Sequence, residues 1–197
     1  MRHFIVIGHD VPLDGEFSLD DIAGEAGRLD VLCRCVSAAV FLSHDIRDNV
    51  QVWLILQNSV TIHIDSENLK YMHPDERNIA ALLRDALQAK SDAIGHQEVT
   101  SSPGIHVSKR GLEPILSSLP ADQPVVQLHH EGTPLPEWHH QTPIVVVSDH
   151  KDFTNTEQSI LQSHRDEKLS VSPQTLHANH AITVMQNYID TQYYTTY

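Results

Sequence analysis

In the second half of the chain, short apolar segments alternate with segments in which apolar residues recur every three or four positions. In chain order these segments are 105–107, 111–119, 125–129, 144–147, 156–164 and 169–171. Strands that alternate with helices in this way form a mainly parallel sheet that is covered by the helices. The sequence therefore predicts an α/β fold.

The first half of the chain predicts three more strands. Residues 2–8 have the pattern of a strand, and residues 50–56 and 60–64 are apolar segments separated by three residues. So short a connection favours an antiparallel hairpin. Residues 91–104 are polar and end in Ser-Ser-Pro-Gly, so we expect a surface loop there. If the single domain 1–197 is subdivided, this loop is where we place the boundary.

Three longer helices are also predicted. The first begins at Leu29, and its apolar spacing places Asp30 and Arg34 together on the polar face. The second covers 74–90, with a proline at its start and two acidic residues in its first turn, where the helix dipole favours them. The last begins with a Ser-Pro pair and covers 172–190. It is apolar on more than one face, so we expect it to be buried on two sides, one of which would suit a subunit interface.

The charge balance is unusual for a protein that binds nucleic acid. Acidic residues number 26 against 13 Lys and Arg, which gives a net charge of −13 at pH 7, whereas nucleic-acid-binding domains are usually basic. The bias towards Asp and away from Lys is similar to that of proteins from salt-loving archaea. At molar salt the screening length falls to about 3 Å, so repulsion from phosphate is short-ranged. The acidity lowers the expectation of an RNA partner without excluding it.

The size and composition indicate a soluble cytoplasmic protein. The chain has 197 residues, of which 40% are hydrophobic, and can build a full core. Its longest apolar runs are far shorter than the roughly 20 residues of a membrane-spanning helix. The pattern of an export signal is missing from the start of the chain. Cys33 and Cys35 stand one residue apart on a predicted helix, so they should point to different sides and cannot form an ordinary disulfide.

Several well-known motifs are missing. The 15 histidines include pairs at 129–130, 139–140 and 177/180, but there is no His-Glu-x-x-His, and adjacent histidines on a strand should point to opposite faces. We therefore predict no metal site. The chain also lacks Gly-x-Gly-x-x-Gly after its first strand, the phosphate-loop motif and Gly-x-Ser-x-Gly. An ordinary dinucleotide fold, a phosphate-loop enzyme and the commonest hydrolase fold are thus not supported.

Three strand-to-turn junctions remain as candidates for a binding site, at 128–132, 147–150 and 169–173. Ligands bind beyond the carboxyl ends of parallel strands, so the three junctions could form one pocket. Ordinary connections without a ligand fit these spacings equally well. Asp30 and Arg34 stand one helical turn apart, an arrangement that a routine surface ion pair explains more readily than chemistry does.

Several long blocks of the sequence resemble, in order and nearly from end to end, the archaeal TrmY family of tRNA pseudouridine N1-methyltransferases. The blocks are Gly27–Val36, Phe41–Arg47, His73–Arg77, Pro103–Ile105 with Ser108, Ser148–Thr154 and His177–Tyr188. The resemblance implies a SPOUT fold, which is a parallel α/β sheet whose C-terminal part forms a trefoil knot. It also implies an S-adenosylmethionine-dependent homodimer that methylates pseudouridine 54 in the T-loop of tRNA and releases S-adenosylhomocysteine. Neither a membrane nor DNA is an expected partner.

The resemblance also implies which residues bind the cofactor. They are Leu128, Ser148, Asp149, Leu169, Ser170, Val171, Ser172, Leu176 and Ala181. Two of them depart from the family pattern, since Ser148 stands where the family commonly has Gly, and Ala181 where it usually has Cys. Ser148 could crowd the cofactor slightly, and Ala181 rules out an obligatory thiol at that position. A cofactor that is recognised mainly through backbone atoms tolerates both.

For the chemistry, the resemblance points to the block that begins at Gly27. We expect Asp30 to orient or deprotonate the N1 edge of the pseudouridine, while Arg34, Arg28 and Arg47 hold the base carbonyls or phosphates of the RNA. Two alternatives stay open. One is the same reaction on ribosomal RNA, and the other is a non-catalytic RNA-binding or assembly protein that keeps the fold without turnover.

Overall fold

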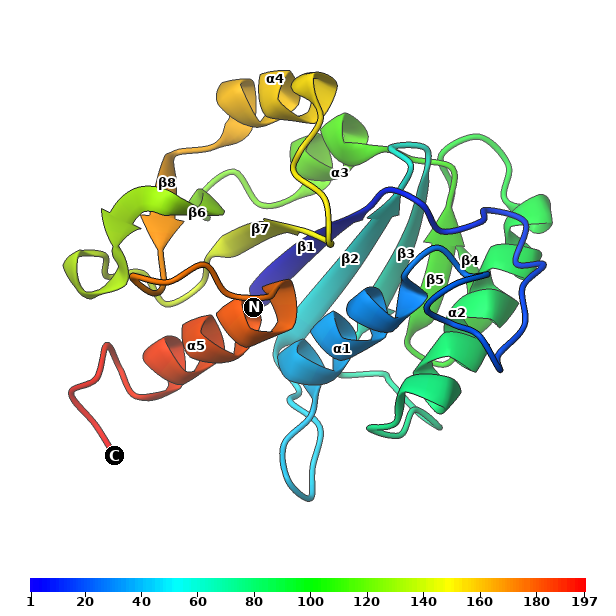
Figure 1. The fold of residues 1–197 in the computed structure, drawn as a ribbon, viewed down its shortest axis with the longest axis horizontal. Helices are drawn as coiled ribbons and strands as arrows, with labels where there is room; N and C mark the ends of the chain where they lie inside the picture. The colour runs from blue at the N-terminus through cyan, green and yellow to red at the C-terminus, as the bar shows by residue number, and fades with distance from the viewer.

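The computed structural model describes residues 1–197 as one eight-stranded sheet with helices on both faces (Figure 1). The strands are β1 (Arg2–Gly8), β2 (Val50–Leu56), β3 (Val60–Asp65), β4 (Val99–Ser102), β5 (Ile105–Ser108), β6 (Val125–Pro134), β7 (Ile144–Ser148) and β8 (Glu167–Ser170). The helices are α1 (Leu29–Val40), α2 (Glu76–Ala89), α3 (Leu112–Ser118), α4 (Asn155–His164) and α5 (Ala178–Asp190). Two short 3-10 helices, Lys90–Asp92 and Leu135–Glu137, complete the elements. No helix has both the length and the apolar content needed to cross a membrane.

The sheet is mixed, so the expectation of a mainly parallel sheet is right for only part of it. Its strand order is β4-β5-β3-β2-β1-β7-β6-β8. β1 is parallel to β2 and β7, and β6 is parallel to β7 and β8. β3 is antiparallel to β2 and β5, and β4 is antiparallel to β5. The predicted hairpin of β2 and β3 is therefore present. All the strand pairs from β2 to the β4 edge of the sheet are antiparallel.

Strand β4 lies within the segment that was predicted to be only a loop. It is a four-residue edge strand whose side chains are half-buried or exposed. An edge strand of this kind has no buried face that would impose an apolar alternation on its sequence. The rest of the segment 91–104 contains a 3-10 turn and loop residues, as the polar composition indicates.

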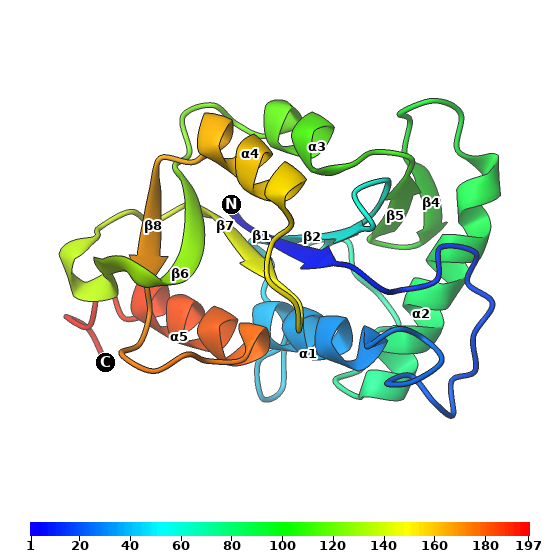
Figure 2. The same cartoon turned by 45° about the horizontal axis from the view of Figure 1, so that its top comes forward.

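The helices form two layers, one on each face of the sheet (Figure 2). Along β1, Phe4 and Val6 belong to the core shared with α1, α2 and α5, whereas Ile5 and Ile7 belong to the core shared with α3 and α4. Because successive side chains of a strand point to opposite faces, a central strand covered on both sides must be apolar at every position. β2 is buried over its whole length for the same reason.

Helix α5 begins at Ala178, so the predicted start at the Ser-Pro pair is wrong. Residues 171–177 form a loop instead, in which the Ser172 hydroxyl accepts a hydrogen bond from the backbone N–H of Gln174 at 3.1 Å. A Ser side chain that bonds the backbone two residues ahead makes a turn and competes with helix capping. This loop carries the chain from the end of β8 to α5.

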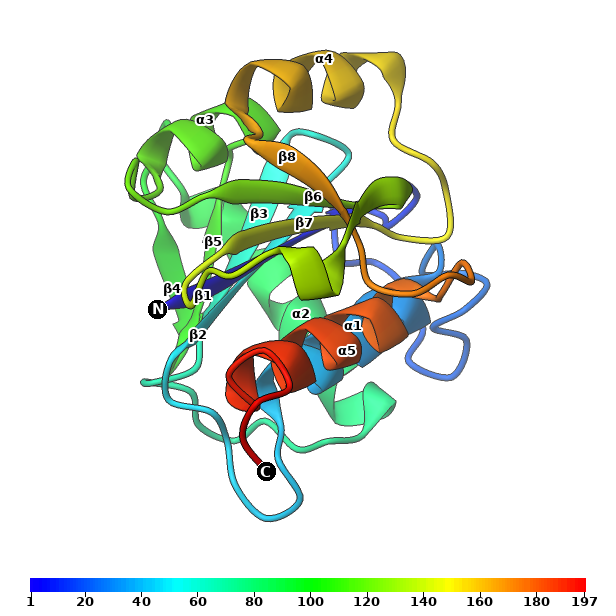
Figure 3. The same cartoon turned by 90° about the vertical axis from the view of Figure 1, so that its left-hand side faces the viewer.

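The apolar faces of α5 are covered by the chain itself. The helix lies beside α1 (Figure 3), and the buried amide of Gln186 donates to the backbone carbonyl of Ala39 at 2.7 Å. On another side, the Tyr188 hydroxyl donates to the carbonyl of Trp138 at 2.6 Å. The predicted burial on two sides is thus confirmed. The exposed side of the helix is polar and includes Thr183 and Asn187.

Candidate functional site

A cavity of about 490 Å³ lies at the carboxyl ends of β7 and β8 and beside residues 128–130 of β6, where the pairing of that strand shifts. Its wall consists of residues 128–130, 147–153, 170–172 and 174–178, together with Gln158 of α4 and Ala181 of α5. The three strands are parallel neighbours, and Leu128 of β6 pairs with Leu169 near the end of β8. The predicted end of the strand at 128–132 is wrong, because β6 continues to Pro134, but residues 128–130 still lie beside the ends of β7 and β8. The three predicted junctions therefore do converge, and the cavity has the size of an ordinary small-molecule site.

Eight of the nine residues predicted to bind a cofactor line this cavity. They are Leu128, Ser148, Asp149, Ser170, Val171, Ser172, Leu176 and Ala181. The ninth, Leu169, is fully buried and pairs with Leu128 in the sheet. Gly132 packs directly on Leu169, since a Cβ atom at Gly132 would lie 2.5 Å from the Leu169 carbonyl carbon. Leu169 therefore packs beneath the residues that line the cavity and does not line it itself.

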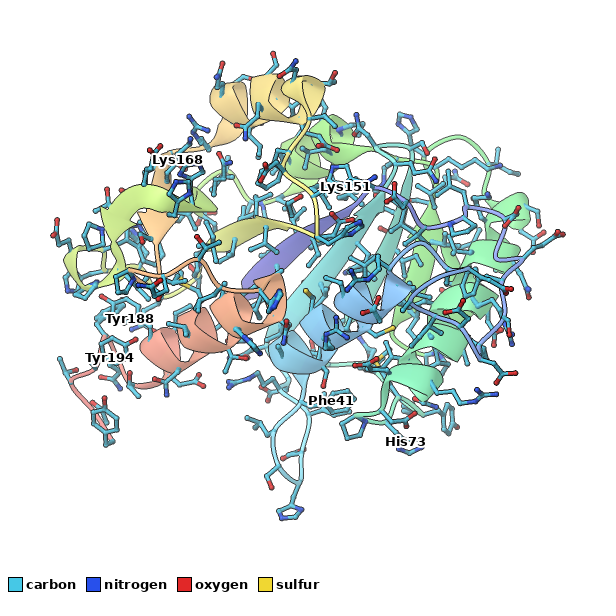
Figure 4. All side chains as sticks on the ribbon, in the orientation of Figure 1. Phe41, His73, Lys151, Lys168, Tyr188 and Tyr194 are labelled. Atoms are coloured by element: carbon cyan, nitrogen blue, oxygen red, sulfur yellow. The ribbon has the colours of Figure 1, made fainter.

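The two positions that depart from the family pattern fit the site without strain. The hydroxyl of Ser148 donates to the backbone carbonyl of Lys151 at 2.5 Å and so bonds within its own loop. Figure 4 shows Lys151 beyond the end of β7, where the chain turns towards α4. Ala181 lies in the first turn of α5 and is buried. Its methyl group adds to the apolar part of the wall.

Asp149 holds two loops of the cavity wall together through hydrogen bonds to their backbones. Its carboxylate is 3% exposed and accepts hydrogen bonds from the backbone N–H groups of Lys151 and His9, both at 2.8 Å. The Nδ1 atom of His9 lies 2.9 Å from the same carboxylate, and Nε2 lies 3.1 Å from Glu157 of α4. Neither His9 nor Glu157 could be singled out from the sequence, because His9 is separated from Asp149 and Glu157 by about 140 positions along the chain.

Histidines surround the opening of the cavity. His129 and His130 both line it, and their rings stack with centroids 4.5 Å apart. The expectation that adjacent histidines point to opposite faces is wrong here, because the pairing of β6 shifts between Leu128 and Thr133 and the residues between them leave the ladder. Burial and the charge of Lys168 lower the pKa of His129.

A metal ion has little support at these histidines. Single ligand atoms of His129, His130 and Glu131 lie within 4.8 Å of one another. The imidazole planes, however, are only 24° from parallel, so their in-plane lone pairs do not converge on one ion. The Nδ1 atom of His129 also accepts the backbone N–H of Glu131 at 3.1 Å.

A second group of charged residues surrounds Asp30 at the start of α1. Arg28 Nε lies 3.0 Å and Arg34 Nη2 lies 2.7 Å from the Asp30 carboxylate, and Arg34 Nη1 lies 3.2 Å from Glu76. The ion pair foreseen for Asp30 and Arg34 is therefore present. It is not a routine surface pair, because the Asp30 side chain is 9% exposed while the Arg28 and Arg34 side chains are 43% and 37% exposed.

The two guanidinium groups determine the ionisation of Asp30. Burial alone would raise the pKa of this carboxyl, but the hydrogen bonds and charges of Arg28 and Arg34 outweigh it and lower the pKa below its usual value of 3.8. Asp30 is thus a carboxylate at neutral pH, and a weak proton acceptor. Each arginine keeps part of its guanidinium open to solvent, so the group presents hydrogen-bond donors around a fixed negative charge.

The backbone before α1 links this group to the cavity. Gly27 and Arg28 both have left-handed conformations, with φ of 59° and 64°. A Cβ atom at Gly27 would lie 2.1 Å from the carbonyl oxygen of Asp10, so only glycine fits there. Asp10 in turn pairs with Lys151 at 2.6 Å and with His150 at 3.3 Å in the cavity wall. The loop after β1 therefore connects the two clusters.

Arg47 lies at the far end of α1 and is not brought to the cavity. Its backbone N–H donates to the carbonyl of Val40, the last residue of α1. Its guanidinium makes two bonds to Asp190, at 2.6 and 3.0 Å, and Arg2 shares the same carboxylate. The Arg47 side chain is 15% exposed.

Comparison with known proteins gives consistent matches over the whole chain. The model of a family described as "Putative SAM-dependent RNA methyltransferase" matches residues 1–194. A protein of Halobacterium salinarum is 54% identical over 203 residues, and one of Haloferax volcanii is 48% identical over 198 residues, with 100% of both chains covered in each case. A protein of Methanococcoides burtonii is 36% identical, with 96% of each chain covered. All three are named tRNA (pseudouridine(54)-N(1))-methyltransferase.

A solved structure shares the fold. The crystal structure of Archaeoglobus fulgidus Nep1 bound to S-adenosylhomocysteine matches with a TM-score of 0.68. The match covers 98% of this chain and 99% of that one, and 12% of the aligned residues are identical. At so low an identity the likeness concerns the fold alone.

Proposed function

The chain belongs to the family of S-adenosylmethionine-dependent tRNA (pseudouridine(54)-N(1))-methyltransferases, and we propose that its cavity binds the cofactor while Arg28, Asp30 and Arg34 hold the target base. The protein is an enzyme that transfers a methyl group to N1 of pseudouridine 54 in tRNA. The observation that carries the assignment of roles is a cavity formed by three parallel strands at the ends of β7 and β8. It is linked through Asp10 to a buried carboxylate between two half-exposed arginines.

The residues of the cavity suit S-adenosylmethionine. The volume of about 490 Å³ lies within the range of about 300 to 1,000 Å³ that small-molecule sites occupy. Leu128, Val171 and Leu176 supply apolar surface for a base, and the loop backbone supplies donors and acceptors. The Ser170 and Ser148 hydroxyls are bonded within their own loops, which fixes the shape of the wall. When bound, the cofactor supplies a methyl group that is already electrophilic because it is attached to a sulfonium.

The protein has to orient the base and assist the loss of its N1 proton. In the transfer, a bond would form between N1 and the methyl carbon, the bond from that carbon to the sulfonium sulfur would break, and the N1 proton would pass to solvent water. Asp30 is a poor general base because its pKa is lowered. It can still accept a hydrogen bond from N1–H, since a carboxylate with two arginine partners has further lone pairs. We therefore assign Asp30 to orienting N1 and holding the two arginines.

Arg28 and Arg34 would stabilise the base as its proton leaves. Negative charge then develops on the C2 carbonyl oxygen next to N1 and, through the C5–C6 double bond, on the C4 carbonyl oxygen. Guanidinium donors fixed beside these oxygens are most effective in the transition state. Their exposed fractions of 43% and 37% leave donors available for this purpose. The target nucleotide would have to leave its stack in the T-loop to reach them. Arg47 would contact the RNA backbone outside the cavity, since its position is remote from both clusters.

We also propose that the chain is one SPOUT domain with a trefoil knot. Residues 134–136 and 170–173 line a second hollow of about 310 Å³ together with Tyr194, so the two segments run side by side. α5 then packs beneath residue 138, where Tyr188 makes its hydrogen bond. A chain that passes from β8 under the segment after β6 has the path of such a knot.

A homodimer is the assembly we propose. Its support is the second hollow, which is lined mainly by Pro, Leu, Val and Tyr side chains and opens near the C-terminal tail. Figure 4 shows Tyr194 in this tail close to Tyr188, and their ring centroids are 5.0 Å apart. An apolar hollow of this kind on the surface suits a protein partner. Light scattering at molar salt measures the mass of the assembly, and we expect that of a dimer. A monomer at micromolar concentration would contradict the proposed homodimer.

The substrate is tested with labelled S-adenosylmethionine and two stem-loop RNAs at molar salt. The RNAs have the sequence of a tRNA T-loop and differ only in carrying uridine or pseudouridine at the target. We expect methyl transfer to the pseudouridine RNA alone. Transfer to both RNAs would contradict N1 of pseudouridine as the target atom, and transfer to neither would favour a ribosomal substrate or a non-catalytic role.

A further inference from the structure

The imidazole of His9 joins the carboxylate of Asp149, which lines the cavity, to that of Glu157, which does not. Its side chain is 11% exposed, and those of Asp149 and Glu157 are 3% and 4% exposed. Nδ1 lies 2.9 Å from Asp149 Oδ1, and Nε2 lies 3.1 Å from Glu157 Oε2. The backbone N–H of His9 also donates to Asp149 Oδ2 at 2.8 Å.

This geometry favours the doubly protonated ring. A neutral imidazole has one N–H, so one of the two carboxylates would face a lone pair. Burial opposes the charge on His9, but the hydrogen bonds and charges of Asp149 and Glu157 outweigh it and raise the pKa above its usual value of 6.5. Two buried carboxylates with a single imidazolium between them form a charge-assisted bridge, which is stronger than a neutral hydrogen bond.

The two carboxylates hold the ends of one segment. Asp149 fixes the turn after β7 through the backbone N–H of Lys151. Glu157 accepts the backbone N–H of Thr154 at 2.8 Å, and the Thr154 hydroxyl accepts the N–H of Glu157 at 3.3 Å, which together cap helix α4. Asp152 and Phe153 lie between these ends and line the cavity. The position of this wall therefore depends on the bridge.

The other charged groups near the bridge are already paired. From the same loop as His9, Asp10 bonds Lys151 at 2.6 Å and His150 at 3.3 Å. From the turn after β7, His150 Nδ1 lies 3.6 Å from the Asp149 carboxylate, farther than the His9 ring. The charge of Arg28 lies within range of Asp149 but makes no bond to it. His9 is thus the group that bonds both buried carboxylates.

We propose that His9 is a positioning residue for the cofactor, whose protonated ring ties Asp149 to Glu157 and so holds residues 149–157 in the shape that binds S-adenosylmethionine. The inference rests on the proposed function of the cavity. It adds a residue that does not line the cavity and reaches the ligand only through the wall. It also makes cofactor affinity depend on the protonation of one ring.

Two variants each remove one of the two hydrogen bonds of the His9 ring. His9→Asn keeps a donor near the position of Nδ1 and loses the bond to Glu157, whereas His9→Gln reaches towards Glu157 and loses the Nδ1 donor. We expect each to raise the Kd for S-adenosylmethionine, measured by calorimetry without RNA, by about tenfold, the effect of one lost charge-assisted hydrogen bond. The matched control is His106→Gln, because His106 is also half-buried but lies in β5, near the opposite edge of the sheet from the cavity. Its Kd should equal that of the unaltered protein.

A role confined to folding is separated from positioning by two further readouts. At saturating cofactor, kcat of the His9 variants should stay within about twofold of the unaltered enzyme, because the base-binding group is intact. Because the pKa of His9 is raised above 6.5, the Kd of the unaltered protein should rise as the pH increases beyond that value and the ring loses a proton, and His9→Gln should remove this rise.

The outcomes distinguish this inference from the function it rests on. If the unaltered protein fails to bind S-adenosylmethionine, the proposed use of the cavity is wrong, and the role of His9 falls with it. If the unaltered protein binds and both His9 variants bind equally well with an unchanged pH profile, the cavity assignment stands and the role of His9 is overturned.

Discussion

The carboxylate of Asp30 lies 2.7 Å from Nη2 of Arg34 across one turn of α1, and the two groups differ sharply in exposure. The Asp30 side chain is 9% exposed, whereas that of Arg34 is 37% exposed. A buried anion that fixes exposed cations is suited to presenting donors to a ligand, because separating the pair would remove one of the two arginines that compensate the buried charge of Asp30.

The stability that Asp30 contributes should depend on pH. Because its folded pKa is lowered below 3.8, its contribution is fully present above the unfolded pKa and is lost as the pH falls through the folded value. The unaltered protein should therefore be more stable than Asp30→Asn at about pH 6, and the difference in Tm should shrink towards about pH 3. Thermal unfolding of both proteins over this range measures it. A difference that grows on acidification would contradict the lowered pKa.

Filling the cavity should weaken cofactor binding. Ala181 lines the cavity from the first turn of α5, so Ala181→Leu would extend a larger side chain into it. We expect the Kd for S-adenosylmethionine to rise at least about tenfold while the protein stays folded. Thr183→Leu, on the exposed side of the same helix, is the control and should leave the Kd unchanged. Equal affinities for both variants would place the cofactor elsewhere.

The close contact between β6 and β8 should not tolerate a side chain. A Cβ atom at Gly132 would lie 2.5 Å from the backbone of Leu169. Gly132→Ala should force the two strands apart and lower the free energy of unfolding by about 1 to 3 kcal/mol. Denaturant unfolding measures the loss. Gly95→Ala is a useful comparison because nothing lies within 4 Å of its Cβ position, although its φ of 58° adds some backbone strain. A loss no larger at Gly132 than at Gly95 would contradict the contact.

Much of the site could be predicted from the sequence because parallel strands impose a simple rule. The pattern of a strand end followed by a turn identifies the junctions after β7 and β8, and parallel strands end at the same edge. The third predicted junction, at 128–132, lies inside β6, where the strand pairing shifts. The start of helix α5 could not be predicted correctly from the sequence. Ser172 and Pro173 have the pattern of a helix start, but the side chain of Ser172 bonds Gln174 and forms a turn, so α5 begins at Ala178.

The features that the sequence could not predict depend on long-range contacts. His9 meets Asp149 and Glu157 only because β1 pairs with β7 and α4 returns over the sheet. The stacking of His129 on His130 depends on a shift in strand pairing, and an edge strand such as β4 has no buried face to mark it. Periodicity and spacing report local structure, whereas these features arise from register.

Arg47 should act on RNA binding without affecting the cofactor. Its guanidinium is held by Asp190 at the far end of α1, away from the cavity. If it also contacts a phosphate, Arg47→Gln should reduce the salt slope of RNA binding by about one and leave the Kd for S-adenosylmethionine unchanged. Titration of a labelled stem-loop at several salt concentrations gives the slope. An unchanged slope with a lowered Tm would assign Arg47 to stability alone.

The central claim is that the cavity binds the cofactor and the group around Asp30 serves the base, and one variant tests both parts together. For Asp30→Asn we predict an unchanged Kd for S-adenosylmethionine and a fall in kcat of about a hundredfold or more on the pseudouridine stem-loop, because the fixed charge is needed only when the base reacts. Asparagine keeps the size of the side chain, and circular dichroism controls for folding. Full activity in Asp30→Asn, or a loss explained entirely by weaker cofactor binding, would contradict this division of roles.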